Sequence, residues 1–154
     1  MPSFRIARFA GRKNRPRRAA AAVEFAVVAP IMVMIVVGSI ELGRSMMVLD
    51  LLNNAARLGC RVGVLPGNGN SDITTAVTNA LSGTGVQGAA APVIEVLPQG
   101  TSKWVSPGDA GSAVQGDTVR VTVSVPYKNV SWLGFNWFMS SSATLTGKIA
   151  MTKE

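Results

Sequence analysis

Hydrophobic residues first form one long uninterrupted pattern. Residues 19–40, AAAAVEFAVVAPIMVMIVVGSI, are apolar or small except for Glu24, and about 20 such residues suffice to cross the hydrocarbon core of a bilayer. Apolar positions then recur at three- and four-residue spacings, which is typical of an amphipathic helix. We therefore expect one helix from Ala20 to about Val62, whose first half crosses a membrane and bends at Pro30.

The second half of this helix is expected to bury one face against the chain's own domain or a partner. The recurring positions are Leu42, Met46, Leu49, Leu52 or Asn53, Ala56, and Cys60 or Gly63. Glu41 and Arg44 are spaced for a local ion pair, or they mark the point where the helix leaves the membrane and meets neighbours. Arg57 and Arg61 lie on a solvated face or on a partner contact.

Shorter patterns follow. A turn cluster at 66–71 precedes a short helix that begins at Ser71 or Asp72, runs through about Ser82 and stops at Gly83. Its expected buried face consists of Ile73, Ala76, Val77, Ala80 and Leu81.

Three segments are expected to be strands, at 92–98, 117–127 and 143–151. The second alternates most cleanly, with valine at 119, 121, 123 and 125, and Gly147 in the third is a candidate bulge. A glycine-rich loop, roughly 99–116, separates the first two strands. The fold class is therefore α+β: a long N-terminal transmembrane and amphipathic helix, then a small head with one short helix and about three antiparallel strands.

Charge divides the chain further. Residues 1–18 hold seven Lys/Arg and no acid, whereas residues 19–154 hold eight basic and eight acidic residues. The positive-inside rule keeps this tail in the cytoplasm and puts the residues after about 41 on the other side. The neutral remainder argues against a nucleic-acid-binding body. For the tail itself, a topology signal, a leader, an acidic-lipid contact and a nucleic-acid contact are the alternatives.

Catalysis and metal binding find little support. Histidine is absent and Cys60 is the single cysteine, so no Cys/His metal site and no intramolecular disulfide can form. No nucleophile–base pair or phosphate loop is present. We expect no enzyme activity, no cofactor and no metal. Cys60 itself is a small helix residue, the partner of an intermolecular disulfide or a reactive thiol.

Basic residues, small residues, a glutamate, an aromatic residue and a long apolar run together resemble a prepilin-type leader. Over residues 17–65 the chain resembles, more narrowly, the TadE-like proteins, pseudopilins of the tight-adherence (Flp pilus) machinery of bacteria. The resemblance implies cleavage between Ala19 and Ala20 by a prepilin peptidase, although alanine stands where the pattern usually has glycine. It also implies that Glu24, next to Phe25, sets the register of subunits by meeting a positive charge such as a neighbour's new N-terminal amine.

The resemblance implies three regions: a basic cytoplasmic leader at 1–19, the helix at 20–65 and an extracytoplasmic α+β head at 66–154. Its partners would be other pilins or pseudopilins, the assembly platform, the peptidase and membrane lipid, in the bacterial cytoplasmic membrane, with no nucleic acid. Helix-packing positions that it carries over are Pro30, Glu41, Gly43, Arg44, Asn54, Ala56, Arg57, Gly59 and Arg61.

Two other interpretations of the sequence stay open. The apolar run could be an ordinary signal peptide or an uncleaved anchor, and Glu24 could simply reach the headgroups. The chain could also be a stand-alone anchored binding module, unrelated to pili, that uses the glycine-rich loop or the aromatic segment WLGFNWFM. In that segment Trp132, Phe135, Trp137 and Phe138 are core residues, an interface belt or a binding patch.

Overall fold

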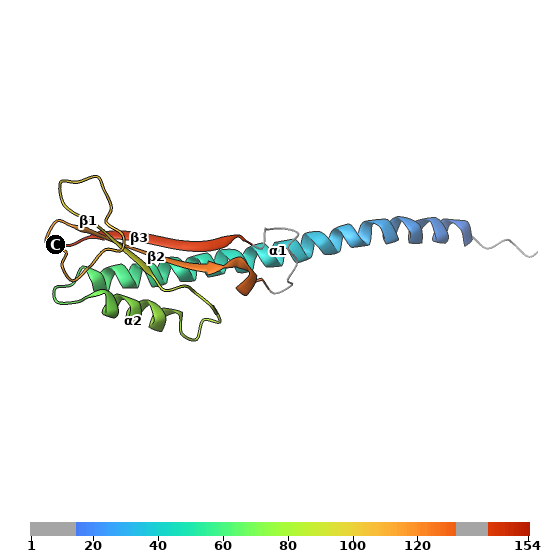
Figure 1. The fold of residues 1–154 in the computed structure, drawn as a ribbon. Helices are drawn as coiled ribbons and strands as arrows, with labels where there is room; N and C mark the ends of the chain where they lie inside the picture. Colours follow the sequence, from blue (N-terminus) through green and yellow to red (C-terminus); the bar gives the residue numbers. More distant parts are fainter. Residues whose placement is uncertain (1–14, 132–141) are drawn as a thin grey trace, which may run out of the picture. The chain divides into compact units, whose positions relative to one another are not determined.

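A computed structural model describes residues 15–131 and 142–154, with side chains described from residue 19 onward. The aromatic segment and most of the basic tail lie outside these residues. The elements, in chain order, are α1 (Arg15–Gly63), α2 (Asn70–Leu81), β1 (Val93–Leu97), β2 (Thr118–Pro126), a short 3₁₀ turn (Tyr127–Asn129) and β3 (Thr144–Thr152) (Figure 1). The predicted α+β class, with one long helix, one short helix and three antiparallel strands, is confirmed.

The chain divides into two compact units, Met1–Gly38 and Ser39–Glu154. In the part that the structure describes, the first unit consists of the beginning of α1. The second unit, called the head below, contains the rest of α1 together with α2 and the sheet. α1 begins at Arg15 and ends at Gly63, so it starts five residues before the predicted Ala20 and ends one residue after Val62.

The sheet has the order β1-β2-β3, and both pairs are antiparallel. Thr118 lies opposite Thr152 and Pro126 opposite Thr144, with every residue between them paired in one continuous register. The predicted bulge at Gly147 is therefore wrong. Glycine is needed there for a different reason: a Cβ would lie 2.6 Å from the backbone nitrogen of Asn53, so its absence lets α1 pass close to β3.

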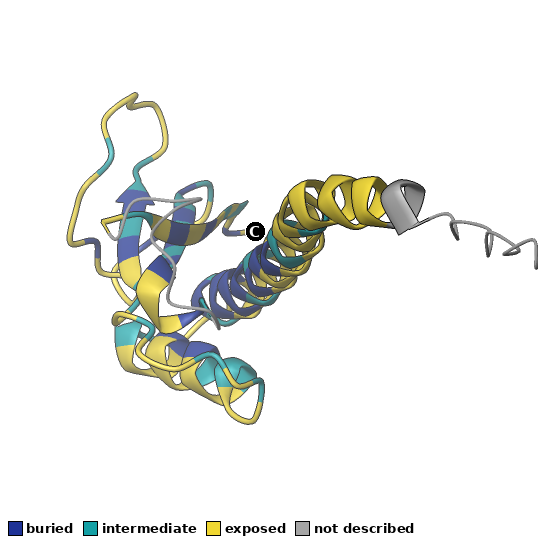
Figure 2. Ribbon diagram, turned by 90° about the vertical axis from the view of Figure 1, so that its right-hand side faces the viewer, coloured by how far each residue is buried: buried dark blue, intermediate teal, exposed yellow. Residues whose placement is uncertain are grey.

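The core lies between the sheet and the helices. The four valines of β2, Val119, Val121, Val123 and Val125, have no exposed surface, and they alternate with half-buried Thr118, Arg120, Thr122 and Ser124 on the other face of the strand. Leu52 and Cys60 of α1 and Ile73 of α2 join the valines in one core (Figure 2). Alternation with period two thus places one face of β2 in the core, as predicted.

α1 does not bury the whole face that its spacing suggested. Leu49 is half-buried and Leu52, Ala56 and Cys60 are buried, as expected, but Leu42 and Met46 are 59% and 58% exposed. Glu41, Ser45 and Val48 take the buried positions of those turns instead. The prediction failed there because apolar residues occupy two sides of α1, and periodicity alone cannot choose between two apolar faces.

α2 starts earlier than predicted, at Asn70 rather than at Ser71 or Asp72. Its first turn is closed by Asp72, whose carboxylate accepts a hydrogen bond of 2.8 Å from the backbone N–H of Gly69. Ile73 and Val77 are buried in the core, while Ala76, Ala80 and Leu81 are half-buried. Gly83 follows the helix with a φ of +77°, a conformation that favours glycine as a helix stop.

Polar side chains hold the loop between β1 and β2. The Asp117 carboxylate accepts hydrogen bonds of 2.9 Å from the backbone N–H groups of Gln99 and Val114, and these bonds lower the pKa of Asp117. The Asn70 amide donates to the Gly108 carbonyl at 2.9 Å and accepts from the Ala110 N–H at 3.0 Å. The loop is thus tied both to β2 and to the beginning of α2.

Candidate functional site

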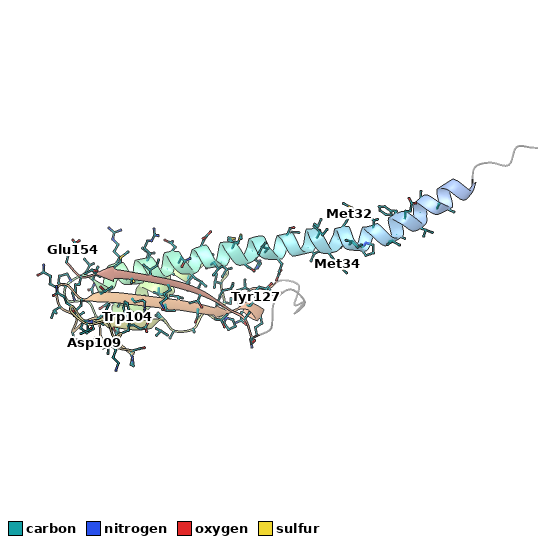
Figure 3. All side chains as sticks on the ribbon, turned by 90° about the horizontal axis from the view of Figure 1, so that it is seen from above. Met32, Met34, Trp104, Asp109, Tyr127 and Glu154 are labelled. Carbon is teal, nitrogen blue, oxygen red and sulfur yellow. The ribbon has the colours of Figure 1, made fainter. Side chains whose placement is uncertain are left out.

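The first half of α1 exposes apolar side chains almost without interruption. Val23, Phe25 and Ile35 are 65%, 70% and 64% exposed, and the best 18-residue window of the helix has a mean hydropathy of 2.5. Figure 3 shows Met32 and Met34 pointing away from this part of the helix. By length and composition the helix can cross a membrane, and lipid or other apolar surfaces would remove this area from water.

The residues predicted for processing and register lie in this half. Ala19, Ala20, Glu24 and Phe25 are all exposed positions of α1, and Pro30 lies within the helix. Glu24 forms no salt bridge with any residue that the structure describes. A carboxylate among exposed apolar side chains requires a partner from outside the described chain if it enters lipid.

Glu41 is the buried charged residue among the predicted helix positions, at 6% exposure. Tyr127, labelled in Figure 3, is the first residue of the 3₁₀ turn that follows β2. Its hydroxyl donates a hydrogen bond of 3.0 Å to Glu41 Oε1. Glu41 Oε2 has no hydrogen-bond partner among the described residues. Burial, followed by the adjacent Glu41 carboxylate, raises the pKa of Tyr127.

Arg44 does not pair with Glu41, contrary to one of the predicted alternatives. Its Nε donates a hydrogen bond of 2.6 Å to the Val130 carbonyl, while Glu41 faces Tyr127. The two residues therefore fasten two points of the segment after β2 to the same turn of α1. Sequence reasoning missed Tyr127, because nothing in the sequence links residue 127 to a helix residue 86 positions earlier.

Other predicted positions pack α1 into the head. A Cβ on Gly59 would lie 2.7 Å from Val77 of α2 and 3.4 Å from Val121 of β2, so glycine permits the three elements to meet. Ala56 and Cys60 have no exposed surface, and the Cys60 thiol donates to the Ile149 carbonyl at 3.1 Å. Cys60 thus occupies a small, buried position, which agrees with the prediction of a small helix residue.

The remaining positions lie on the outward face of α1. Gly43, Asn54, Arg57 and Arg61 are exposed. A shallow groove of about 600 Å³ runs along this face and is lined by Gly43, Met46, Met47, Asp50, Leu51 and Asn54. Met46 and Met47 are 58% and 61% exposed. The structure therefore separates the predicted helix positions into an inner set, which builds the head, and an outer set that is exposed and forms no ion pair with a described residue.

The outer face of the sheet carries the one described salt bridge. Arg120 Nε lies 2.6 Å from Glu95 Oε2, and the Arg120 guanidinium lies 3.6 Å from the centre of the Trp104 ring. The hydrogen bond from Arg120 lowers the pKa of Glu95. These three groups satisfy one another and hold the loop against the sheet. Among the described residues no cluster of three metal-ligating side chains is found.

The family model described as TadE-like protein matches residues 19–61. No curated protein and no solved structure matches the chain. The matched residues run through the exposed apolar part of α1 and on to the turns that pack in the head. They include every helix position that the sequence singled out for processing, register and packing. Over residues 19–61 the chain is therefore similar to the TadE-like proteins.

Proposed function

We propose that this protein is a minor pilin-like (pseudopilin) structural or assembly protein of a tight-adherence pilus or secretion system. The family match suggests a pilus-associated protein. The observation that carries the proposal is that α1 has two different parts. Residues 19–38 expose apolar or small residues and Glu24. The later part of α1 packs one face in the head and leaves the opposite face exposed.

The proposed mechanism has three steps. The apolar half of α1 enters the cytoplasmic membrane with the basic tail on the cytoplasmic side and the head on the other. A prepilin peptidase then cuts between Ala19 and Ala20. Finally, α1 packs laterally against the helices of other pilin-like subunits, where Glu24 meets a positive charge and fixes the register.

The described residues support a structural role better than a stand-alone binding module. The glycine-rich loop, one of the two proposed ligand surfaces, is held within the chain at several points: Asp117 and Asn70 bind its backbone, and Trp104 stacks on Arg120. The aromatic segment, the other surface, lies outside the described residues. No described feature therefore favours the alternative.

Mass spectrometry of the protein extracted from membranes of its native host tests the processing step. We expect a mature chain that begins at Ala20. As a control, the same measurement in a strain without the prepilin peptidase should return the uncut chain. An intact N-terminus in the wild-type host would contradict the proposed leader.

A further inference from the structure

We propose that the outward face of α1 in the head binds α1 of a second copy of this chain, parallel and displaced by seven residues, so that Asp50 of one copy pairs with Arg57 of the other. The inference deepens the proposed function and rests on it in one respect: both copies must enter the membrane in the same direction. The outward face is defined here by Ile40, Gly43, Met47, Asp50, Leu51, Asn54, Arg57, Leu58 and Arg61.

The first supporting observation is the unused glycine. Gly59 and Gly63 are required within the chain, because a Cβ on either would lie 2.7 Å or 2.8 Å from a side chain of α2. At Gly43 a Cβ would meet nothing within 4 Å. Glycine inside a helix is less favourable than alanine, so its presence at an empty position requires a reason outside the described chain. Close approach of a second helix supplies that reason.

The second observation is the spacing of charges. Asp50 and Arg57 are both exposed, and neither forms a salt bridge with a described residue. Seven residues make almost two helical turns, so both side chains lie on one face but are too far apart to pair with each other. Intrahelical pairs need a spacing of three or four residues. A parallel helix displaced by seven residues, roughly 10 Å along the axis, brings Asp50 level with Arg57.

The same displacement matches the other outward positions. Ile40 comes level with Met47 and Leu51 with Leu58, so that apolar side chains meet. Asn54 comes level with Arg61, whose guanidinium can donate to the amide oxygen. Gly43 comes level with Asp50 and leaves it room.

Other parallel registers fit less well. In-register packing places Asp50 against Asp50 and Arg57 against Arg57, and like charges disfavour such contacts. A displacement of four residues places Arg57 beside Arg61. A displacement of eleven pairs Asp50 with Arg61 but leaves Arg57 level with Met46, where no acceptor is available.

Disulfide cross-linking of the full-length protein tests the register. Two differently tagged copies, one with Met47→Cys and the other with Asn54→Cys, are expressed together in a bacterial host without pilus genes, and membranes are treated with a mild oxidant. We expect several-fold more cross-linked heterodimer than from two copies that both carry Met47→Cys. Cys60 has no exposed surface, so the native thiol does not compete. An equal or larger yield for the in-register pair would overturn the inference.

Charge exchange tests the pairing itself. Asp50→Arg in both copies should lower the cross-linking yield roughly tenfold, equivalent to about 1.4 kcal/mol of association free energy, and so should Arg57→Asp. The double variant Asp50→Arg/Arg57→Asp should restore the yield. If Arg61→Asp, and not Arg57→Asp, restored the cross-linking yield of Asp50→Arg, the eleven-residue register would be established and the proposed one overturned.

Gly43→Leu supplies the steric control. It should reduce cross-linking without lowering the melting temperature of the detergent-extracted protein, because Gly43 is exposed and no described atom lies within 4 Å of a Cβ there. Cross-linking of native-host membranes then separates the two proposals. A correctly processed, pilus-associated chain that cross-links only to a different protein would overturn the self-pairing alone. A self-cross-linked chain absent from pilus fractions would overturn the pilus role alone.

Discussion

Three glycines in the head sit in three different surroundings. At Gly147 a Cβ would meet the backbone of α1, and at Gly59 it would lie 2.7 Å from a methyl group of Val77. A side chain can shift, whereas a helix backbone cannot do so cheaply. We therefore expect Gly59→Ala to cost about 1–3 kcal/mol of unfolding free energy and Gly147→Ala to cost more.

Denaturant unfolding of the full chain in detergent, followed by circular dichroism, measures these losses. Gly43→Ala is the matched control, and it should raise stability by about 0.5–1 kcal/mol because a Cβ there meets no described atom within 4 Å. Equal losses at all three positions would show that the close approaches at Gly59 and Gly147 do not limit the packing.

Tyr127 is the second residue whose removal has a definite expected effect. Tyr127→Phe leaves the buried Glu41 carboxylate without its hydroxyl donor, and an unsatisfied buried acceptor costs about 1–3 kcal/mol. The double variant Glu41→Leu/Tyr127→Phe should lose less than the sum of the two single variants, because both changes remove one interaction. Additive losses would contradict the contact.

The raised pKa of Tyr127 also predicts a dependence on alkaline pH. Its ordinary value is about 10, so above that pH the unfolded chain loses its tyrosine proton before the folded chain does. The stability contributed by the neutral hydroxyl is complete below pH 10 and disappears as the pH rises through the folded-state pKa. Unfolding measured at pH 8 to 11 should show a steeper decline for the native chain than for Tyr127→Phe.

At the scale of elements, Asp117 controls the long loop before β2. Its pKa is lowered by hydrogen bonds from the backbone N–H groups of Gln99 and Val114. The ionised form is thus favoured in the folded state, and its contribution is complete above the ordinary value of 3.8 and disappears as the pH falls through the lowered one. Compared with the native chain, Asp117→Asn should have a lower free energy of unfolding at neutral pH, and acidification should lower that free energy less. Glu154→Gln, at an exposed position, is the control, and acid profiles of Asp117→Asn and the native chain that are identical would argue against this role.

Regular elements were predictable to the extent that one periodicity decided them. β2 alternates valine with polar residues over its whole length, and α1 keeps a continuous helical pattern, so both were identified to within a few residues. The face of α1 that is buried near Leu42 was not predicted correctly, because apolar residues lie on both sides of the helix there. Asn70, Asp117 and Tyr127 could not be found, since each forms a hydrogen bond with a residue 18 or more positions away along the chain.

At the scale of the whole molecule, Glu24 should matter for assembly and not for folding. Glu24→Gln keeps the shape of the side chain but removes the charge proposed to meet a neighbouring subunit. We expect unchanged membrane insertion and head stability, with loss of co-purification with pilus components from the native host. Glu154→Gln, at an exposed position outside the helix, is the control. Full pilus association of Glu24→Gln would remove the proposed register role.

Because the sulfur atom of Cys60 is buried, disulfide formation by this chain should report whether the head is folded. Because Cys60 has no exposed surface and its thiol donates to the Ile149 carbonyl, a correctly folded copy offers no thiol to an oxidant in solution. A copy whose head has opened presents the single thiol of the chain and becomes able to join another such copy. On non-reducing electrophoresis, folded wild-type subunits should run as monomers. Disulfide-linked dimers should arise only from copies whose head has opened.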